Sequence, residues 1–117
     1  MARLRLRGEV LRADTRDLTM LHRFEGFADL TGALDLTREL ASSGSSFSID
    51  PADYGLSTLS DVYLFCDSPV LVTLDGETSG QLDVDEILLV RGTQLSGLTV
   101  LNNLSGAARV RILFGGD

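Results

Sequence analysis

The chain has 117 residues, of which 44% are hydrophobic, and a formal net charge of −7. This length suits one domain with its own core and is too short for two. The apolar content is typical of a folded protein rather than a disordered one. No apolar run approaches the roughly 20 residues of a membrane span, and the basic start leads into no apolar signal-peptide segment. We therefore expect a soluble protein without a membrane partner, not exported by the usual route.

Charge is unevenly distributed along the chain. Residues 1–23 carry six arginines against three acids, residues 24–90 carry thirteen acids against Arg38 alone, and residues 91–117 carry three arginines against one acid. An acidic body of this kind repels nucleic acid, so we expect no nucleic-acid partner. The asymmetry either serves solubility or permits contacts between copies of the chain.

The first predicted element is a strand at the start of the chain. Leu4 and Leu6 alternate with arginines at the odd positions, the period of a half-buried strand. The arginine side is either solvated protection of a sheet edge or a docking surface. Its members are Arg3, Arg5 and Arg7.

Residues 14–30 fit two patterns. One set of apolar residues recurs every three positions, as in a helix: Leu18, Leu21, Phe24 and Phe27. A second set alternates, as in a strand: Leu18, Met20, His22 and Phe24. Because Gly26 weakens a long helix, we favour a strand or irregular structure, with a short helix as the alternative. The following segment, residues 33–40, alternates again and predicts a strand.

The middle of the chain begins with a predicted loop. Residues 41–55 are rich in Ser and Gly and contain Pro51 and Gly55, so we expect them to be mostly loop. Loops of this kind often carry contacts. We therefore name Tyr54 as a candidate contact residue.

Two strands follow this loop, separated by a break at residues 67–69. In the first, around residues 62–66, both alternating sets of side chains are apolar, which predicts burial on both faces. The second covers residues 70–74 and ends at the turn sequence DGETSG. A further short strand is predicted at residues 87–90.

The last element is predicted to be a hairpin over residues 98–113. Leu98 and Val100 supply one apolar face and the alternating residues after position 107 supply another, while the sequence NNLSG between them suits a turn. Arg109 and Arg111 are expected to face outward.

These segments together predict the fold class. Seven or eight short strands at a spacing of roughly ten residues, with turn signals between them, indicate an all-β protein. We expect an antiparallel β-sandwich or jelly roll, with residues 1–117 forming a single domain.

The sequence offers little catalytic chemistry. Cys66 lies among large apolar residues, as a buried inert thiol would, and the single histidine, His22, is distant from it in sequence. One His and one Cys leave a zinc site short of ligands, and the acidic cluster around Asp83, Asp85 and Glu86 lacks the spacing of a calcium loop. No GxSxG elbow or phosphate-binding loop is present. We expect no enzyme activity, catalytic residue, cofactor or metal.

The second half of the chain resembles small virion structural proteins of tailed bacteriophages. The similar stretches are LSDVYLFCDSPVLVTLDGE and LLVRGTQLSGLTVLNNLSGAARVRILFGGD, roughly the last 60 residues. The residues that match the family's strand and turn pattern are Asp67, Pro69, Val70, Leu74, Gly76, Gly92, Thr93, Leu98, Val100, Asn102, Ser105, Gly106, Ala108, Val110, Ile112 and Leu113.

This resemblance implies a non-enzymatic part of the virion, made in the host cytoplasm and assembled in multiple copies. Head decoration, head–tail joining and a tail or baseplate role are all compatible with it. The partners would be other copies of the chain and virion proteins such as the major capsid or tail proteins. Candidate interface residues are Arg3, Arg5, Arg7, Tyr54, Arg109 and Arg111. The alternative is a small β-sandwich module that binds carbohydrate or a protein partner, and a third possibility is a metal-dependent cupin-like enzyme.

Overall fold

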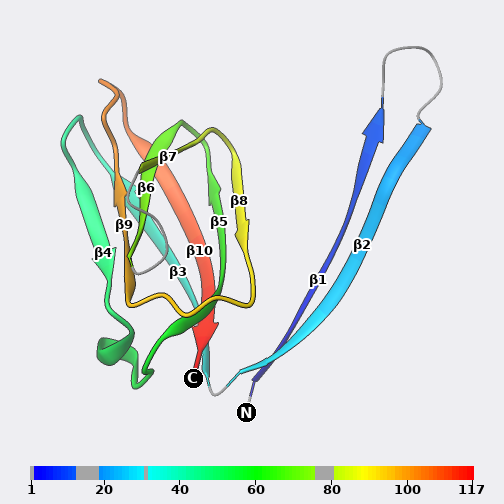
Figure 1. Ribbon diagram of the computed structural model, residues 1–117. Helices are drawn as coiled ribbons and strands as arrows, with labels where there is room; N and C mark the ends of the chain where they lie inside the picture. Colours follow the sequence, from blue (N-terminus) through cyan, green and yellow to red (C-terminus); the bar gives the residue numbers. More distant parts are fainter. Residues whose placement is uncertain (1, 13–18, 31, 76–80) are drawn as a thin grey trace.

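A computed structural model describes residues 2–12, 19–30, 32–75 and 81–117, and shows a β-sandwich with a separate two-stranded ribbon (Figure 1). In chain order the elements are β1 (Ala2–Arg12), β2 (Thr19–Leu30), β3 (Gly32–Leu40), β4 (Ser46–Ile49), the 3-10 helix η1 (Pro51–Tyr54), β5 (Leu59–Cys66), β6 (Val70–Asp75), β7 (Gln81–Val84), β8 (Ile87–Val90), β9 (Gly97–Leu101) and β10 (Ala108–Gly116).

The sandwich consists of two four-stranded antiparallel sheets, with strand orders β3-β10-β5-β8 and β4-β9-β6-β7. Of its consecutive strands, β6 and β7 are neighbours in one sheet, and every other consecutive pair is split between the two sheets. Two four-stranded sheets wound in this way form a jelly roll. The predicted all-β antiparallel sandwich or jelly roll is thus confirmed.

The core lies between the two sheets and follows from the period-two pattern of the strands. Val62 and Leu64 of β5, Val72 of β6 and Val110 of β10 are fully buried. Phe114 is also fully buried, and its ring forms an edge-to-face contact with the ring of Tyr54, with 5.2 Å between ring centroids. The arrangement combines large burial with a favourable aromatic geometry.

The loop predicted for residues 41–55 contains more regular structure than its composition suggests. Strand β4 pairs with β9, and η1 follows it directly. The side chain of Asp50 caps η1 by accepting a hydrogen bond from the backbone N–H of Ala52, and Gly55 ends it at φ +73°. The prediction that this segment is mostly loop is therefore wrong for residues 46–49, which form a strand, and for residues 51–54, which form a 3-10 helix.

The predicted C-terminal hairpin is also wrong. β9 and β10 both form where expected, but β9 pairs with β4 and β6 whereas β10 pairs with β3 and β5, in the opposite sheet. The turn sequence NNLSG thus connects two layers rather than two paired strands. Strand β7 was not foreseen as a separate element.

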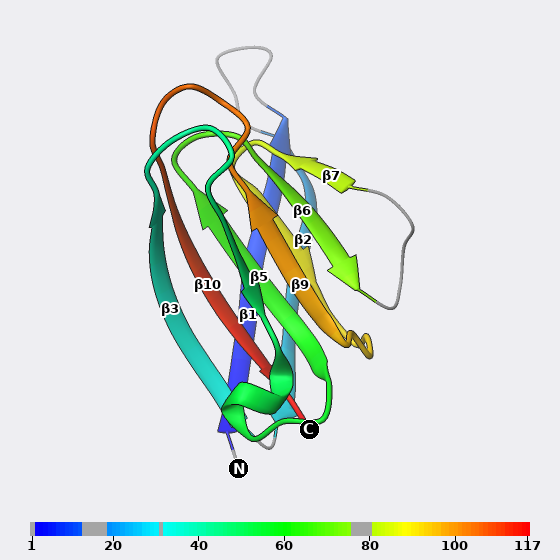
Figure 2. The ribbon, with the colours of Figure 1, turned by 90° about the vertical axis from the view of Figure 1, so that its left-hand side faces the viewer.

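β1 and β2 form a ribbon of their own, and residues 19–30 are strand rather than helix. Residues 13–18 lie outside the described part of the chain. Figures 1 and 2 together show that the ribbon lies on the side of the β3-β10-β5-β8 sheet and diverges from the sandwich, meeting it near β3. The sandwich has eight strands, within the seven or eight predicted for it, and the ribbon adds two, so the described part of the chain has ten strands.

In the described part of the chain, no helix has the length and hydrophobicity that a membrane crossing requires.

Candidate functional site

The ribbon, defined as β1 and β2, has one charged face. Arg3, Arg5 and Arg7 are all exposed on β1, as the alternation predicted. Arg5 forms an ion pair with Glu25 of β2 at 2.7 Å, and Arg23 forms one with Glu9 at 2.9 Å. Arg7 forms no ion pair with any residue that the structure describes. Exposed pairs of this kind contribute little to stability, so they do not explain why the ribbon is ordered.

The opposite face of the ribbon is apolar. The ring of Phe24 lies directly over Gly8, its partner on β1, and occupies the space that a Cβ would fill. Leu6 and Phe24 are half-buried, and the His22 ring stacks on Phe24 with 6.3 Å between centroids. A two-stranded ribbon without a core behind it is only marginally stable in water, so this face is well suited to packing against another surface.

A second apolar surface lies on the outer face of the β3-β10-β5-β8 sheet. Phe65 of β5 and Ile87 of β8 are direct partners, and Leu89 lies two residues further along β8 on the same side. Their exposed fractions are 36%, 53% and 39%. We call these three residues the apolar patch. The prediction that β5 is buried on both faces is therefore wrong for Phe65, although its neighbour Tyr63 is buried.

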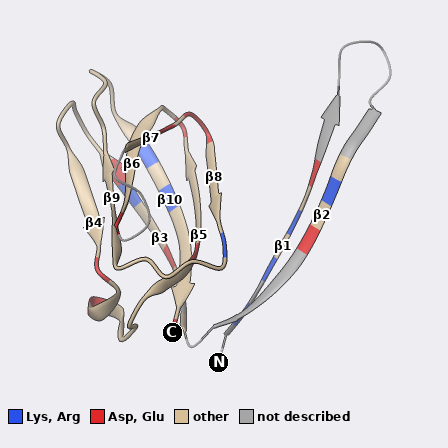
Figure 3. Cartoon of the chain, viewed as in Figure 1, with Lys and Arg blue, Asp and Glu red and all other residues tan. Residues whose placement is uncertain are grey.

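Acidic residues border the apolar patch. Asp67 follows β5, and Asp85 and Glu86 precede β8 (Figure 3). Burial is the main cause that raises the pKa of the Cys66 thiol. The negative charges of these three acids lie close enough to raise it further. The patch thus lies beside a local concentration of negative charge.

Arg109 and Arg111 line an open hollow on the same outer face. Its volume is about 340 Å³, and its other lining residues are Thr37, Phe65, Cys66 and Asp67. Arg111 forms a two-point ion pair with Asp35 of β3, at 2.7 and 3.1 Å. The hydrogen bond that Asp35 accepts from Arg111 is the main cause that lowers the pKa of the Asp35 carboxyl. Both arginines are exposed, as predicted.

The structure brings some of the candidate interface residues together and separates others. Arg109 and Arg111 share the hollow, whereas Arg3, Arg5 and Arg7 lie on the ribbon. Tyr54 is half-buried in η1 and packs against the core through Phe114. The ring of Tyr54 therefore contributes to the packing of the sandwich.

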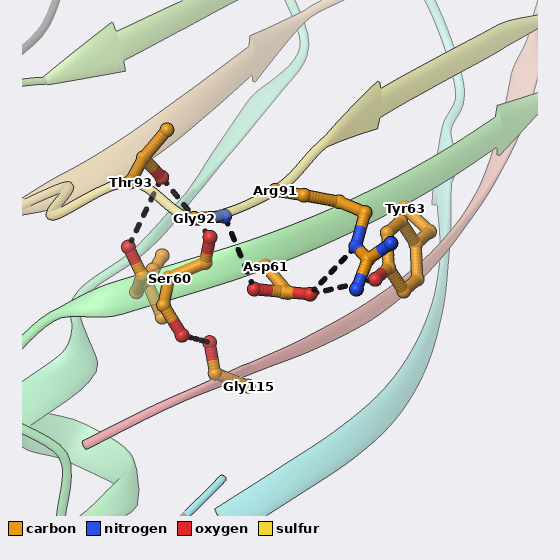
Figure 4. A network of polar contacts seen from close by, with 8 residues as sticks. Ser60, Asp61, Tyr63, Arg91, Gly92, Thr93 and Gly115 are labelled. Atoms are coloured by element: carbon orange, nitrogen blue, oxygen red, sulfur yellow. Dashed lines mark hydrogen bonds and ion pairs between the residues drawn. The ribbon is translucent and has the colours of Figure 1, made fainter. Parts of the chain in front are cut away.

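A buried polar network on β5 was not anticipated from the sequence. Asp61 is only 3% exposed and accepts hydrogen bonds from the Tyr63 hydroxyl at 2.7 Å and the Gly92 backbone N–H at 3.4 Å (Figure 4). Arg91 lies 3.5 Å from the same carboxylate. Burial, and then the Asp61 carboxylate, raise the pKa of Tyr63 to about 12. Through Arg91 and Gly92, the network connects the segment that follows β8 to Asp61 of β5. It thereby helps to hold the edge strand β8, which carries Ile87 and Leu89, against β5.

Neither of the residues that could suggest catalysis is placed for it. Cys66 is buried and its Sγ donates to the Val84 carbonyl at 3.6 Å, while His22 is exposed on the ribbon. A nucleophilic thiol needs a lowered pKa and a base at hand. Among the described residues, no three His, Cys, Asp or Glu side chains are grouped so that they could hold a metal ion.

The scan against protein-family models gives no match, and the search of curated proteins gives none either. The fold and the two apolar surfaces are therefore the basis for assigning a function.

Proposed function

We propose that the protein is a non-enzymatic structural component of a tailed-phage particle, which assembles in multiple copies on the head, the neck or the tail. The ribbon is the observation that carries this proposal. It diverges from the sandwich, which it meets mainly near β3 (Figure 1). One of its faces carries the half-buried side chains of Leu6 and Phe24. Such a ribbon gains stability when it packs against a neighbour.

Multiple weak contacts suit this role. In a closed ring or a lattice, each contact raises the effective concentration of the next, so modest interfaces yield a durable assembly. The jelly roll is an architecture that viral capsid proteins use, and the second half of the chain resembles phage virion proteins. Because a fold by itself does not determine function, the proposal relies on the ribbon first.

The test is to locate the protein in purified phage particles. We expect mass spectrometry to detect it in stoichiometric amounts and a labelling antibody to decorate one part of the particle in electron micrographs. A protein found only in the unassembled fraction of the lysate would contradict the proposal.

A second candidate function is binding of a carbohydrate. The hollow beside Phe65, with Arg109 and Arg111 at its wall, favours it because sugar sites combine an exposed aromatic ring with a few polar groups. Screening on a glycan array separates the two candidates. Saturable binding that is lost in Phe65→Ala would favour the sugar-binding module, and no binding would favour the structural role.

A further inference from the structure

We propose that the ribbon of one copy docks on the apolar patch of the next copy, in a head-to-tail contact. This inference rests on the proposed multi-copy assembly and specifies the surfaces that make it. The donor surface is the ribbon face that carries Leu6 and Phe24, and the acceptor is formed by Phe65, Ile87 and Leu89.

Apolar area is the first reason for this pairing. The patch exposes three large apolar side chains, and on the ribbon Leu6 and Phe24 are only half-buried. Removing such apolar surface from water is favourable by roughly 25 cal/mol per Å². The three patch residues are contiguous on adjacent strands rather than scattered, and contiguous apolar surface usually marks an interface. Both surfaces belong to the same chain, so every copy offers one donor and one acceptor.

Charge is the second reason, and it identifies the occupant. Residues 1–31 carry six arginines against five acids, whereas residues 32–117 carry four arginines against twelve acids. Two sandwiches, each with a balance of −8 over residues 32–117, therefore repel each other, whereas residues 1–31, which contain the ribbon, have a balance of +1. The acids beside the patch, Asp67, Asp85 and Glu86, disfavour the approach of a second sandwich. The ribbon arginines lie on the face opposite Leu6 and Phe24, so their charge assists the encounter at long range rather than forming contacts in the interface.

Placement is the third reason. The ribbon lies on the side of the outer sheet face but diverges from it, so its main contact with its own sandwich is at β3 (Figures 1 and 2). It therefore leaves the patch of its own chain open to a neighbour. Because the donor and the acceptor are two distinct surfaces of one chain, the contact can build a ring, a filament, or a dimer in which each ribbon docks on the patch of the other copy.

The experiment is a mixing test with full-length variants. Ile87→Asp removes the acceptor but keeps the ribbon, and Phe24→Asp removes the donor but keeps the patch. We expect wild type to be oligomeric by light scattering and each variant to be monomeric. An equal mixture of the two variants retains one working contact, so we expect a dimer of one copy of each.

Controls separate loss of docking from loss of folding. Leu104→Asp places the same charge on another exposed apolar residue, 43% accessible, outside both surfaces, and should assemble like wild type. Arg7→Gln removes the charge of an exposed side chain that has no ion-pair partner among the described residues, and it places no second acid opposite the cross-strand residue Glu25, so it should not perturb the fold. We expect this variant to associate more slowly than wild type, with a weaker dependence on salt.

Each remaining outcome overturns the proposal in a distinct way. An oligomeric Ile87→Asp variant shows that the patch is not the acceptor. An oligomeric Phe24→Asp variant shows that the ribbon is not the donor, and a mixture of two monomeric variants that stays monomeric shows that the ribbon and the patch do not bind each other. In each of these cases wild type is still assembled, so the proposed function stands while this interface fails. A monomeric wild type that is nonetheless found in purified particles overturns the interface alone, and one absent from particles overturns both.

Discussion

The Phe24 ring covers Gly8 on the neighbouring strand of the ribbon, at a point where any Cβ would collide with it. An aromatic ring laid over a cross-strand glycine is a known way to hold such a pair together. It gives a ribbon without a core one site of close packing.

Gly8→Val should therefore displace the Phe24 ring and loosen the ribbon while leaving the sandwich intact. We expect faster trypsin cleavage within residues 1–23, which contain six arginines, with no change in the unfolding midpoint of the sandwich. Gly106→Val is the matched control, because a Cβ at that position meets open space. Equal cleavage rates for the two variants would show that the Phe24–Gly8 contact does not order the ribbon.

Asn102→Ala should destabilise the sandwich. The buried side-chain amide of Asn102 donates to the carbonyls of Leu40 and Gly106 and accepts from the Leu104 N–H. Its removal leaves the buried carbonyl of Leu40 unsatisfied, at a cost of roughly 1–3 kcal/mol in the free energy of unfolding. Urea denaturation measures this, with the exposed neighbour Asn103→Ala as control. A loss shared equally by both variants would contradict this role for Asn102.

Tyr63 should stay protonated to unusually high pH. Its folded-state pKa, raised to about 12, lies above the ordinary value of 10.0, so the folded state holds this proton more tightly than the unfolded state. The resulting stability is fully present below pH 10 and is lost as pH rises from about 10 to about 12. In Tyr54→Phe, Tyr63 is the only tyrosine left, and tyrosinate absorbance reports its titration directly. A midpoint near 10 in folded protein would contradict the network in Figure 4.

Cys66 should react slowly with thiol reagents in the folded protein. Burial, reinforced by the nearby carboxylates, raises the pKa of its thiol, and the thiolate is the reactive form. We expect little labelling at neutral pH, an increase at alkaline pH, and complete labelling once urea unfolds the chain. Rapid labelling of folded protein at neutral pH would point to an activated thiol and would weaken the non-enzymatic assignment.

Local pattern was sufficient to predict most strands and the face that each residue occupies. Arg109 and Arg111 face outward and Val110 is buried, as alternation requires. Strand partners were harder to predict. Leu98 and Val110 are buried whether β9 and β10 pair with each other or lie in opposite sheets, so the apolar pattern does not distinguish a hairpin from a connection between sheets.

The candidate surfaces depend on contacts that a single sequence does not encode locally. The alternation in residues 2–12 predicted a strand with an arginine face, but nothing in it signals that the apolar face lacks a core. Phe65 and Tyr63 occupy the same side of β5, yet only Tyr63 is buried, because the segment after β8 and the network around Asp61 lie beside it. The one feature of the sequence that could have indicated this network is Asp61, an acid beside an apolar run, because a buried acid needs hydrogen-bond partners.

The central claim, that the protein acts as an assembly of copies, is tested most directly by sedimentation velocity of the wild-type chain over a wide concentration range. We expect species at multiples of 12.6 kDa whose proportion grows with concentration and falls as salt is added. A single species of 12.6 kDa at every concentration and salt would contradict self-assembly.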